Sequence, residues 1–153
     1  MFRDHPIAEN DAIDPMSFIL NVIWLIAGGA VAALGWFVAA IVMVVTIIGI
    51  PFARAAFDNG VYTLWPFGVR SADRERLYGG DIGTGPLGFL GNIVWFILAG
   101  WWLALGHVVV AIACALTVIG LPFAWAHLKL AGFAIWPIGR AVVRHDIYRR
   151  RYD

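Results

Sequence analysis

Two long stretches without a charged side chain dominate the pattern of the sequence. Residues 15–53 and residues 82–128 contain no Asp, Glu, Lys or Arg, while charged residues gather before, between and after them. A helix needs about 20 apolar residues to cross a hydrocarbon core of ~30 Å. Each stretch is therefore too long for one straight crossing, and the pattern predicts helices that fold back within a membrane.

The two stretches resemble one another when the sequence is displaced by 71 positions. Asn-Val-Ile-Trp at residues 21–24 aligns with Asn-Ile-Val-Trp at 92–95, and Trp-Pro-Phe-Gly at 65–68 aligns with Trp-Pro-Ile-Gly at 136–139. Apolar composition alone does not place Asn, Trp, Pro and Gly at fixed offsets. The sequence therefore predicts an internal tandem repeat.

A glycine near the middle of each stretch predicts where each copy folds back. Breaks near Gly35 and Gly106 leave first segments at residues 18–35 and 89–106, both of membrane-spanning length. Glycine suits a tight turn between antiparallel helices. We therefore expect an all-α membrane protein of two tandem helical hairpins, with about four transmembrane helices and additional interfacial amphipathic segments.

The charged segments set the expected topology. Two crossings per copy return the chain to its starting side, so the basic loop and the basic tail share a face, and cytoplasmic segments collect Lys and Arg. Both termini are therefore expected in the cytoplasm, with the copies related by a pseudo-axis along the membrane normal. The expected divisions are a polar N-terminal tail at 1–16, a first membrane repeat at 17–70, a cytoplasmic loop at 71–87, a second membrane repeat at 88–141 and a basic cytoplasmic tail at 142–153.

Composition separates the chain from soluble domains. It is 61% hydrophobic and 14% charged, with a mean hydropathy of +0.80, whereas soluble domains are about half apolar and a quarter charged. A soluble protein of 153 residues needs more polar side chains to cover its surface. The net charge of +1 gives no general attraction to nucleic acid, and no nucleic-acid partner is expected.

A repeated Thr-x-x-Gly-x-Pro motif is the first candidate site. Proline removes a backbone donor and clashes with the carbonyl four residues earlier, and in lipid that carbonyl must find another partner. Transporters place ion and substrate sites at such broken helices. The alternative is a plain kink that lets an amphipathic segment lie on the membrane surface. The candidate kink or gate residues are Thr46, Gly49, Pro51, Thr117, Gly120 and Pro122.

Two pairs of equivalent polar residues are further candidates. Asn21 and Asn92 lie a few residues into their segments, where an amide seeks a partner, and are expected to pack between the copies. Asp58 and Lys129 occupy equivalent positions with opposite charge. They are expected either to pair at the cytoplasmic rim or to extend separately toward the headgroups.

The basic C-terminal segment is a candidate for contact with anionic lipid. Basic residues next to a membrane surface attract anionic headgroups at ~1 kcal/mol each. The alternative is that they only set the topology. The candidate residues are Arg140, Arg144, Arg149, Arg150 and Arg151.

Catalytic and metal chemistry find little support in the sequence. His107 and His127 are expected on opposite membrane faces, without a third ligand near either, so no metal site is expected. No Ser, His and acid set is spaced for nucleophilic catalysis. Gly-Thr-Gly-Pro-Leu-Gly at residues 83–88 follows a charged loop rather than a strand, which is the wrong context for dinucleotide binding. No cofactor is therefore expected.

The repeated elements resemble a known family. The run of residues 92–107, followed by Thr-Val-Ile-Gly-Leu-Pro-Phe at 117–123 and Trp-Pro-Ile-Gly-Arg at 136–140, is similar to the YccF family of bacterial inner-membrane proteins, and the first copy resembles the other half of that family. The resemblance covers about residues 18–144. It implies a multi-pass protein of the bacterial inner membrane, and it implies no reaction.

Three functions remain after these arguments. The favoured hypothesis is a non-enzymatic structural or interaction component of the inner membrane, in contact with lipids and assembled as a homo-oligomer or within a larger complex. The alternative is a small oligomeric ion channel or transporter with kinked helices at the Gly-x-Pro motifs. An intramembrane enzyme is disfavoured, because the polar residues of the expected spans are only Asn, Thr, His and one Cys.

Overall fold

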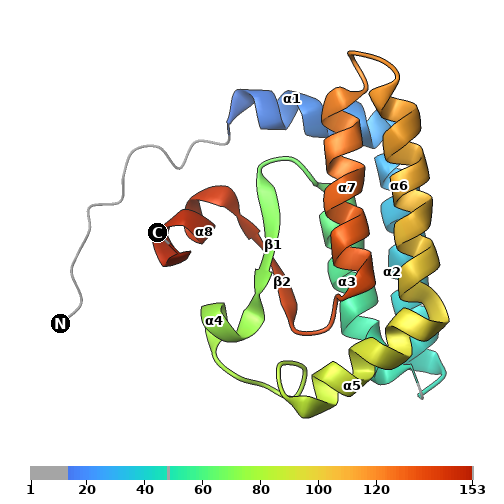
Figure 1. Cartoon of the computed structure of the whole chain (residues 1–153), viewed down its shortest axis with the longest axis vertical. Coiled ribbons are helices and arrows are strands. Elements are labelled where there is room, and N and C mark those ends of the chain that lie inside the picture. The colour runs from blue at the N-terminus through green and yellow to red at the C-terminus, as the bar shows by residue number, and fades with distance from the viewer. Residues whose placement is uncertain (1–13, 48, 153) are drawn as a thin grey trace.

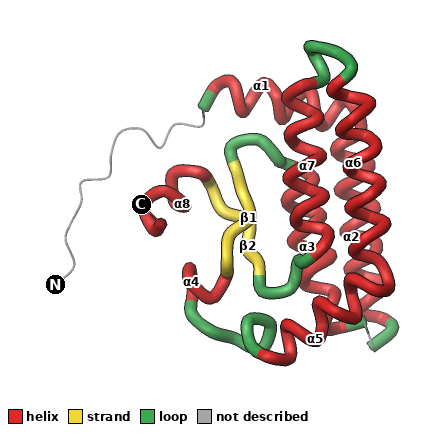
Figure 2. The backbone as a smooth tube through the Cα atoms, in the orientation of Figure 1, coloured by secondary structure: helices red, strands yellow, loops and turns green. Residues whose placement is uncertain are grey.

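The computed structural model describes residues 14–47 and 49–152 (Figure 1). Most of this part of the chain is helical, and the long helices lie on one side of a short two-stranded sheet (Figure 2). The predicted N-terminal tail, residues 1–16, lies outside the described residues except for its last three.

The first copy begins with a long helix that bends at a π-helical turn. Helix α1 (Pro15–Trp24) passes through η1 (Leu25–Gly29) into α2 (Ala30–Val45). Gly28 within the turn has a φ of 125°, a backbone conformation that favours glycine. The bend sets α1 crosswise to α2 (Figure 1).

The second copy repeats this arrangement. Helix α5 (Pro86–Trp95) passes through η2 (Phe96–Gly100) into α6 (Trp101–Ala115). Proline occupies the first turn of α1 and α5, where the backbone N–H makes no hydrogen bond within the helix. The carboxylate of Asp14 also caps α1 by accepting from the N–H of Ser17 at 3.1 Å. By length and composition both long helices suffice to cross a membrane.

The predicted breaks at Gly35 and Gly106 are wrong. Both glycines lie inside continuous helices, and the chain folds back later, between Val45 and Ile50 and between Ala115 and Leu121. A glycine inside a helix costs only ~1 kcal/mol, whereas a proline there costs ~3 kcal/mol and is accepted in a first turn. The prolines therefore determine the hairpin ends, and the four predicted crossing segments are not the helices of the structure.

The return helices form the inner layer of the molecule. Helix α3 (Ile50–Leu64) packs along α2, and α7 (Leu121–Ile135) packs along α6. Both also contact the sheet. Their inward side chains join the main buried cluster, which contains Trp24, Tyr62, Phe67, Ala126, Leu130 and Phe133.

A two-stranded antiparallel sheet covers the inner helices, and the sequence did not predict it. Strand β1 (Val69–Asp73) leads into α4 (Arg74–Tyr78), and β2 (Arg140–Arg144) leads into α8 (His145–Tyr152). The register pairs Ser71 with Val142 at its centre, two positions that the 71-residue displacement of the repeat makes equivalent. Part of the predicted loop and part of the predicted tail are therefore ordered structure.

The two hairpins point in opposite directions. The turn between α2 and α3 lies at the lower end of the bundle, and the turn between α6 and α7 lies at the upper end (Figure 1). Aromatic contacts agree with this arrangement, because Trp24 at the base of the first hairpin stacks on Phe123 near the turn of the second, and Trp95 stacks on Phe52.

Candidate functional site

Asn21 and Asn92 close their own copies of the repeat. The Asn21 amide donates to the Phe67 carbonyl at 3.0 Å and accepts from the Phe67 N–H at 3.0 Å. Asn92 makes the same two contacts with Ile138, at 2.9 and 3.0 Å. Both asparagines are buried. Their observed contacts are thus made within each copy, in contrast to the predicted packing between copies.

Two tryptophans add equivalent contacts that the sequence analysis did not assign. The indole N–H of Trp24 donates to the Thr63 carbonyl at 2.7 Å, and that of Trp95 donates to the Ala134 carbonyl at 2.8 Å. Each tryptophan is buried beside the C-terminal end of the return helix. The Asn-x-x-Trp signature therefore fixes the first helix of each copy to the end of its last helix.

The Thr-x-x-Gly-x-Pro motifs form the turns between helices. Thr46 Oγ1 donates to the Met43 carbonyl at 3.0 Å, and Thr117 Oγ1 donates to the Cys114 carbonyl at 3.2 Å. Thr117 Oγ1 also accepts from the N–H of Gly120 at 3.0 Å. Gly49 and Gly120 immediately precede α3 and α7, and Pro51 and Pro122 lie in the first turns. The prolines start helices here and do not kink one.

His107 and His127 face each other across the second hairpin. Their Nδ1 atoms lie 3.0 Å apart, so the prediction that they occupy opposite membrane faces is wrong. It depended on a break at Gly106, and the continuous α6 instead carries His107 alongside α7. In the described part of the chain, no group of three or more His, Cys, Asp or Glu side chains is arranged to hold a metal ion.

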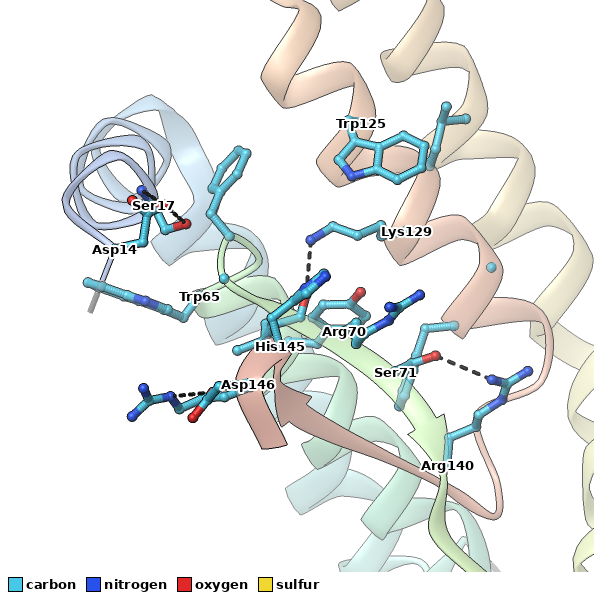
Figure 3. Close-up of a pocket in the computed structure, with 18 residues that line it drawn as sticks. Asp14, Ser17, Trp65, Arg70, Ser71, Trp125, Lys129, Arg140, His145 and Asp146 are labelled. Atoms are coloured by element: carbon cyan, nitrogen blue, oxygen red, sulfur yellow. Dashed lines mark hydrogen bonds and ion pairs between the residues drawn. The ribbon is translucent and has the colours of Figure 1, made fainter. Parts of the chain in front are cut away.

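A pocket of about 940 Å³ lies where the sheet meets α1 and α7 (Figure 3). Its apolar wall is aromatic and includes Tyr62, Trp65, Trp125 and Phe133. Its basic side chains come from α7, β1 and β2. We call this cavity the basic pocket, and its charged or ionisable lining residues are Asp14, Arg70, Lys129, Arg140, Arg144, His145 and Asp146.

Lys129 extends into the basic pocket from α7. Its ammonium donates to the backbone carbonyls of Pro66 and Val69, the latter at 3.1 Å. These contacts hold the ammonium against the start of β1 (Figure 3). Carbonyls carry no net charge, so the positive charge of Lys129 is not neutralised by them.

The arginines of the basic pocket are held by neighbours on the sheet side. Arg140 donates to the Ser71 hydroxyl at 3.4 Å, and the guanidinium carbon of Arg70 lies 4.0 Å from the ring centroid of Tyr148. These two neighbours are neutral, and the strand register also sets Asp73, which is not a lining residue, opposite Arg140. The lining itself therefore has more basic than acidic side chains next to an aromatic surface.

Two carboxylates also line the basic pocket and compensate only part of this charge. Asp146 pairs with Arg144 at 3.1 Å, and Asp14 accepts hydrogen bonds from the Ser17 hydroxyl and N–H, which lower its pKa. Burial and the nearby Arg70 lower the pKa of His145, which favours its uncharged form. Four cationic side chains thus face two carboxylates.

A second pocket, of about 600 Å³, occupies the equivalent place in the other copy. Asp58 stands there where Lys129 stands in the basic pocket. Asp58 forms its ion pair with Arg54 at 3.9 Å, and within the described residues no ion pair joins it to Lys129. The predicted Asp58–Lys129 pair is therefore not formed, because the two residues line different pockets.

The loop before α5 forms part of the lining of the second pocket. Buried Arg74 donates to the Asp81 carboxylate at 2.7 Å, and this hydrogen bond lowers the pKa of Asp81. Asp81 and Gly83 line the pocket together with Gly88 of α5. The two cavities have therefore diverged: the first is larger and basic, and the second is smaller and contains the Arg74–Asp81 ion pair.

Comparison with known proteins identifies the family. The model of the YccF family, described as an inner membrane component domain, matches two segments of the chain, residues 19–69 and 90–140. The chain belongs to the YccF family. Inner membrane protein YccF of Escherichia coli (strain K12) is 35% identical over 148 residues, which cover 90% of this chain and 100% of that protein. The protein of the same name from Shigella flexneri matches equally, and no solved structure matches.

The segments that match the YccF family contain only some of the residues that line the basic pocket. They include Lys129, the aromatic wall and Arg140, but they end before Arg70 and before Arg144. The structural contacts of Asn21 and Asn92 lie wholly inside the matched segments. The YccF match therefore covers the scaffold, while part of the basic wall lies beyond it.

Sequence reasoning found only part of this site. Lys129, Arg140 and Arg144 were candidates, whereas Arg70, Ser71 and His145 were not. Arg149 belongs to α8 and does not line the pocket, and the side chains of Arg150 and Arg151 lie outside the described structure. A strand pairing between β1 and β2 would have placed Arg70 next to the strand that carries Arg140 and Arg144, but two five-residue strands give a weak pattern signal.

Proposed function

We propose that this chain is a non-enzymatic component of the inner membrane that binds the phosphate headgroup of an anionic lipid in the basic pocket. Membership of an inner-membrane family supports the location. The pocket supports the ligand, because a phosphate seeks cationic donors and the attached acyl chains seek an apolar surface.

One observation carries the proposal. Lys129 from α7, Arg70 from β1 and Arg140 from β2 line one cavity whose lining also includes several aromatic side chains (Figure 3). Basic side chains near a membrane attract anionic lipid at ~1 kcal/mol each. Here they surround a cavity, which favours one headgroup held in place over diffuse attraction.

We further propose that the sheet, α4 and α8 face the cytoplasm. They carry Arg70, Arg74, Arg76, Arg140, Arg144 and Arg149, and cytoplasmic segments of membrane proteins are rich in Lys and Arg. Homo-oligomerisation stays a prediction. The alternative of a channel gated at broken helices is not favoured, because the proline motifs lie at hairpin turns.

The lipid proposal can be tested by native mass spectrometry of the purified protein. Bound phosphatidylglycerol is compared with bound phosphatidylcholine for the unaltered chain, for Arg70→Gln with Arg140→Gln, and for Lys129→Met. Loss of two charges at ~1 kcal/mol each predicts roughly 30-fold weaker binding of the anionic lipid. Arg54→Gln in the second pocket is the matched control and is expected to retain binding.

Two results would count against the proposal. Equal retention of phosphatidylcholine and phosphatidylglycerol would show that charge does not select the lipid. Displacement of the lipid by millimolar inorganic phosphate would assign the basic pocket to a free anion. Because Lys129 also holds two carbonyls, the elution volume and circular dichroism of each variant serve to establish that the fold is retained.

A further inference from the structure

The outer helices α2 and α6 have an exposed apolar face. Helices α2 and α6 contain no charged residue, and exposed valine, leucine and isoleucine side chains recur along both. Contiguous apolar patches beyond a few hundred Å² are rare on soluble monomers. This face is therefore expected to contact lipid.

Charge collects on the opposite side of the molecule. The sheet, α4 and α8 lie on one side of the inner helices, and α2 and α6 lie on the other (Figures 1 and 2). The sheet lies beside the middle of the bundle, between the levels of the two hairpin turns (Figure 1). The apolar face and the basic face both run parallel to the long axes of the hairpins. The protein must therefore be oriented in the membrane so that the first face meets lipid and the second meets headgroups or water.

An upright orientation fails this requirement. If α2 and α6 ran along the membrane normal, the two turns would lie at opposite membrane surfaces. The arginines of the sheet would then lie at the depth of the hydrocarbon, where such charges are strongly unfavourable. The turns would also meet water with apolar side chains, since Ile47 is 73% exposed and Ile119 is 84% exposed.

We propose that the protein, in contrast to the multi-pass topology expected from the sequence, inserts from the cytoplasmic side into one leaflet, with both hairpins lying along the membrane plane. The apolar face of α2 and α6 then rests in the acyl chains, and the sheet rests at the headgroups. Helices α1 and α5 descend into the leaflet. Each has 10 residues, or about 15 Å, which is half of a ~30 Å hydrocarbon core.

The symmetry of the fold agrees with this orientation. The antiparallel register is centred on Ser71 and Val142, so the pseudo-twofold axis of the strand pair is perpendicular to the sheet. With the hairpins in the membrane plane, that axis coincides with the membrane normal, and both copies enter from the same side. The upright orientation would instead invert one copy relative to the other.

Backbone groups at the turns are prepared for an apolar environment. Lipid supplies no hydrogen bonds, so groups at that depth must be satisfied within the protein. The N–H of Ile50 donates to the Ile47 carbonyl, and that of Gly120 donates to the Thr117 carbonyl, both at 3.1 Å. The threonine hydroxyl at each turn donates to a further carbonyl.

Depth measurements along two helices test the orientation. In a Cys114→Ser background, single cysteines replace the exposed residues Val31, Val38 and Val45 of α2. A fluorescent label on each is quenched by lipids with nitroxides at known depths, in phosphatidylglycerol–phosphatidylethanolamine vesicles. The proposal predicts one common depth for the three labels. An upright α2 places the outer two about 21 Å apart along the membrane normal, so the three labels would not share one depth, and that result would overturn the proposal.

Helix α1 provides the matched control with the opposite expectation. Labels at Met16, Ile19 and Ile23, which are also exposed, are predicted to deepen steadily by about 10 Å. An upright bundle would keep them at one depth. In intact cells, an impermeant maleimide is predicted to leave both Ile47→Cys and Ile119→Cys unlabelled, and periplasmic labelling of either would overturn the proposal. The orientation does not depend on the lipid site, so either proposal can fail alone.

Discussion

Both polar ends of the Asn21 side chain bind the backbone of Phe67, 46 residues further along the chain. This pair of hydrogen bonds joins the first helix of the copy to the segment that leads into β1. It therefore fixes the position of the sheet relative to the helices, and with it the two walls of the basic pocket.

Replacement of this asparagine is expected to destabilise the fold. Asn21→Ala leaves the N–H and the carbonyl of Phe67 buried without their partner, and buried unpaired groups cost about 1–3 kcal/mol each. We expect a loss of about 2–6 kcal/mol in the free energy of unfolding, measured by denaturant titration in detergent. Asn92→Ala should cost a similar amount, since its contacts are equivalent. A change below the experimental error in both variants would contradict this account.

Two glycines of the first long helix are expected to respond in opposite ways to alanine. A Cβ at Gly29 would overlap the indole of Trp24, whereas a Cβ at Gly35 meets no atom within 4 Å. We expect Gly29→Ala to destabilise by about 1–3 kcal/mol through overpacking. Gly35→Ala should stabilise by about 0.4–1 kcal/mol, because alanine has less backbone freedom to lose on folding. The melting temperatures of the two variants in one detergent test this contrast, and equal shifts would refute it.

The Arg74–Asp81 pair is expected to make the stability of the fold decrease at acidic pH. The hydrogen bond from Arg74 lowers the pKa of Asp81 below its usual 3.8. The ionised carboxylate therefore contributes stability above the usual pKa, and that contribution is lost as the pH falls through the lowered value. Asp81→Asn should lower the melting temperature at pH 7, and the difference from the unaltered chain should shrink in acid. A difference that is constant over this range would contradict the assignment.

The register of the sheet can be tested by a cross-link. Ala72 and Ala141 are direct cross-strand partners, and such Cβ atoms lie about 4.5–5.5 Å apart. In the Cys114→Ser background, Ala72→Cys with Ala141→Cys should oxidise to a disulfide. After cleavage at a protease site inserted near residue 80, the two fragments should stay joined until a reductant is added. The misaligned pair Ala72→Cys with Val143→Cys is the control and should link less completely.

The sequence anticipated the membrane environment and the residues that organise each copy. Asn21, Trp24 and their equivalents stood out because polar and aromatic residues recurred at a fixed offset in apolar segments. Their partners were not predictable, since Phe67 and Thr63 contribute backbone atoms, and nothing in a side-chain pattern marks a backbone acceptor. The mistaken expectation of contacts between copies has this origin.

The fold-back position depends on proline more than on glycine. Breaks at Gly35 and Gly106 divide each stretch into segments of membrane-spanning length, which is why the sequence favours them. A single glycine does not end a helix that is otherwise apolar and well packed, whereas proline restricts the chain on its N-terminal side. The same error separated His107 from His127, which the continuous helix brings together.

The basic pocket was only partly predictable for a topological reason. Arg70 and Arg140 belong to two paired strands that are separated in the sequence by most of the second copy. Neither strand has a clear alternation of apolar and polar residues, with sequences Val-Arg-Ser-Ala-Asp and Arg-Ala-Val-Val-Arg. Charge alone identified Arg140 and Arg144, but the cavity exists only after the sheet forms.

The register of β1 and β2 suits an origin of the chain by duplication. Because β1 pairs with its own equivalent about a twofold axis, the pairing needs no difference between the two partners. Two separate, identical half-length polypeptides would meet through the same strands as a symmetric dimer. Once the two halves are joined in one chain, each can change independently. Equivalent positions can then hold different residues, as Asp58 and Lys129 do.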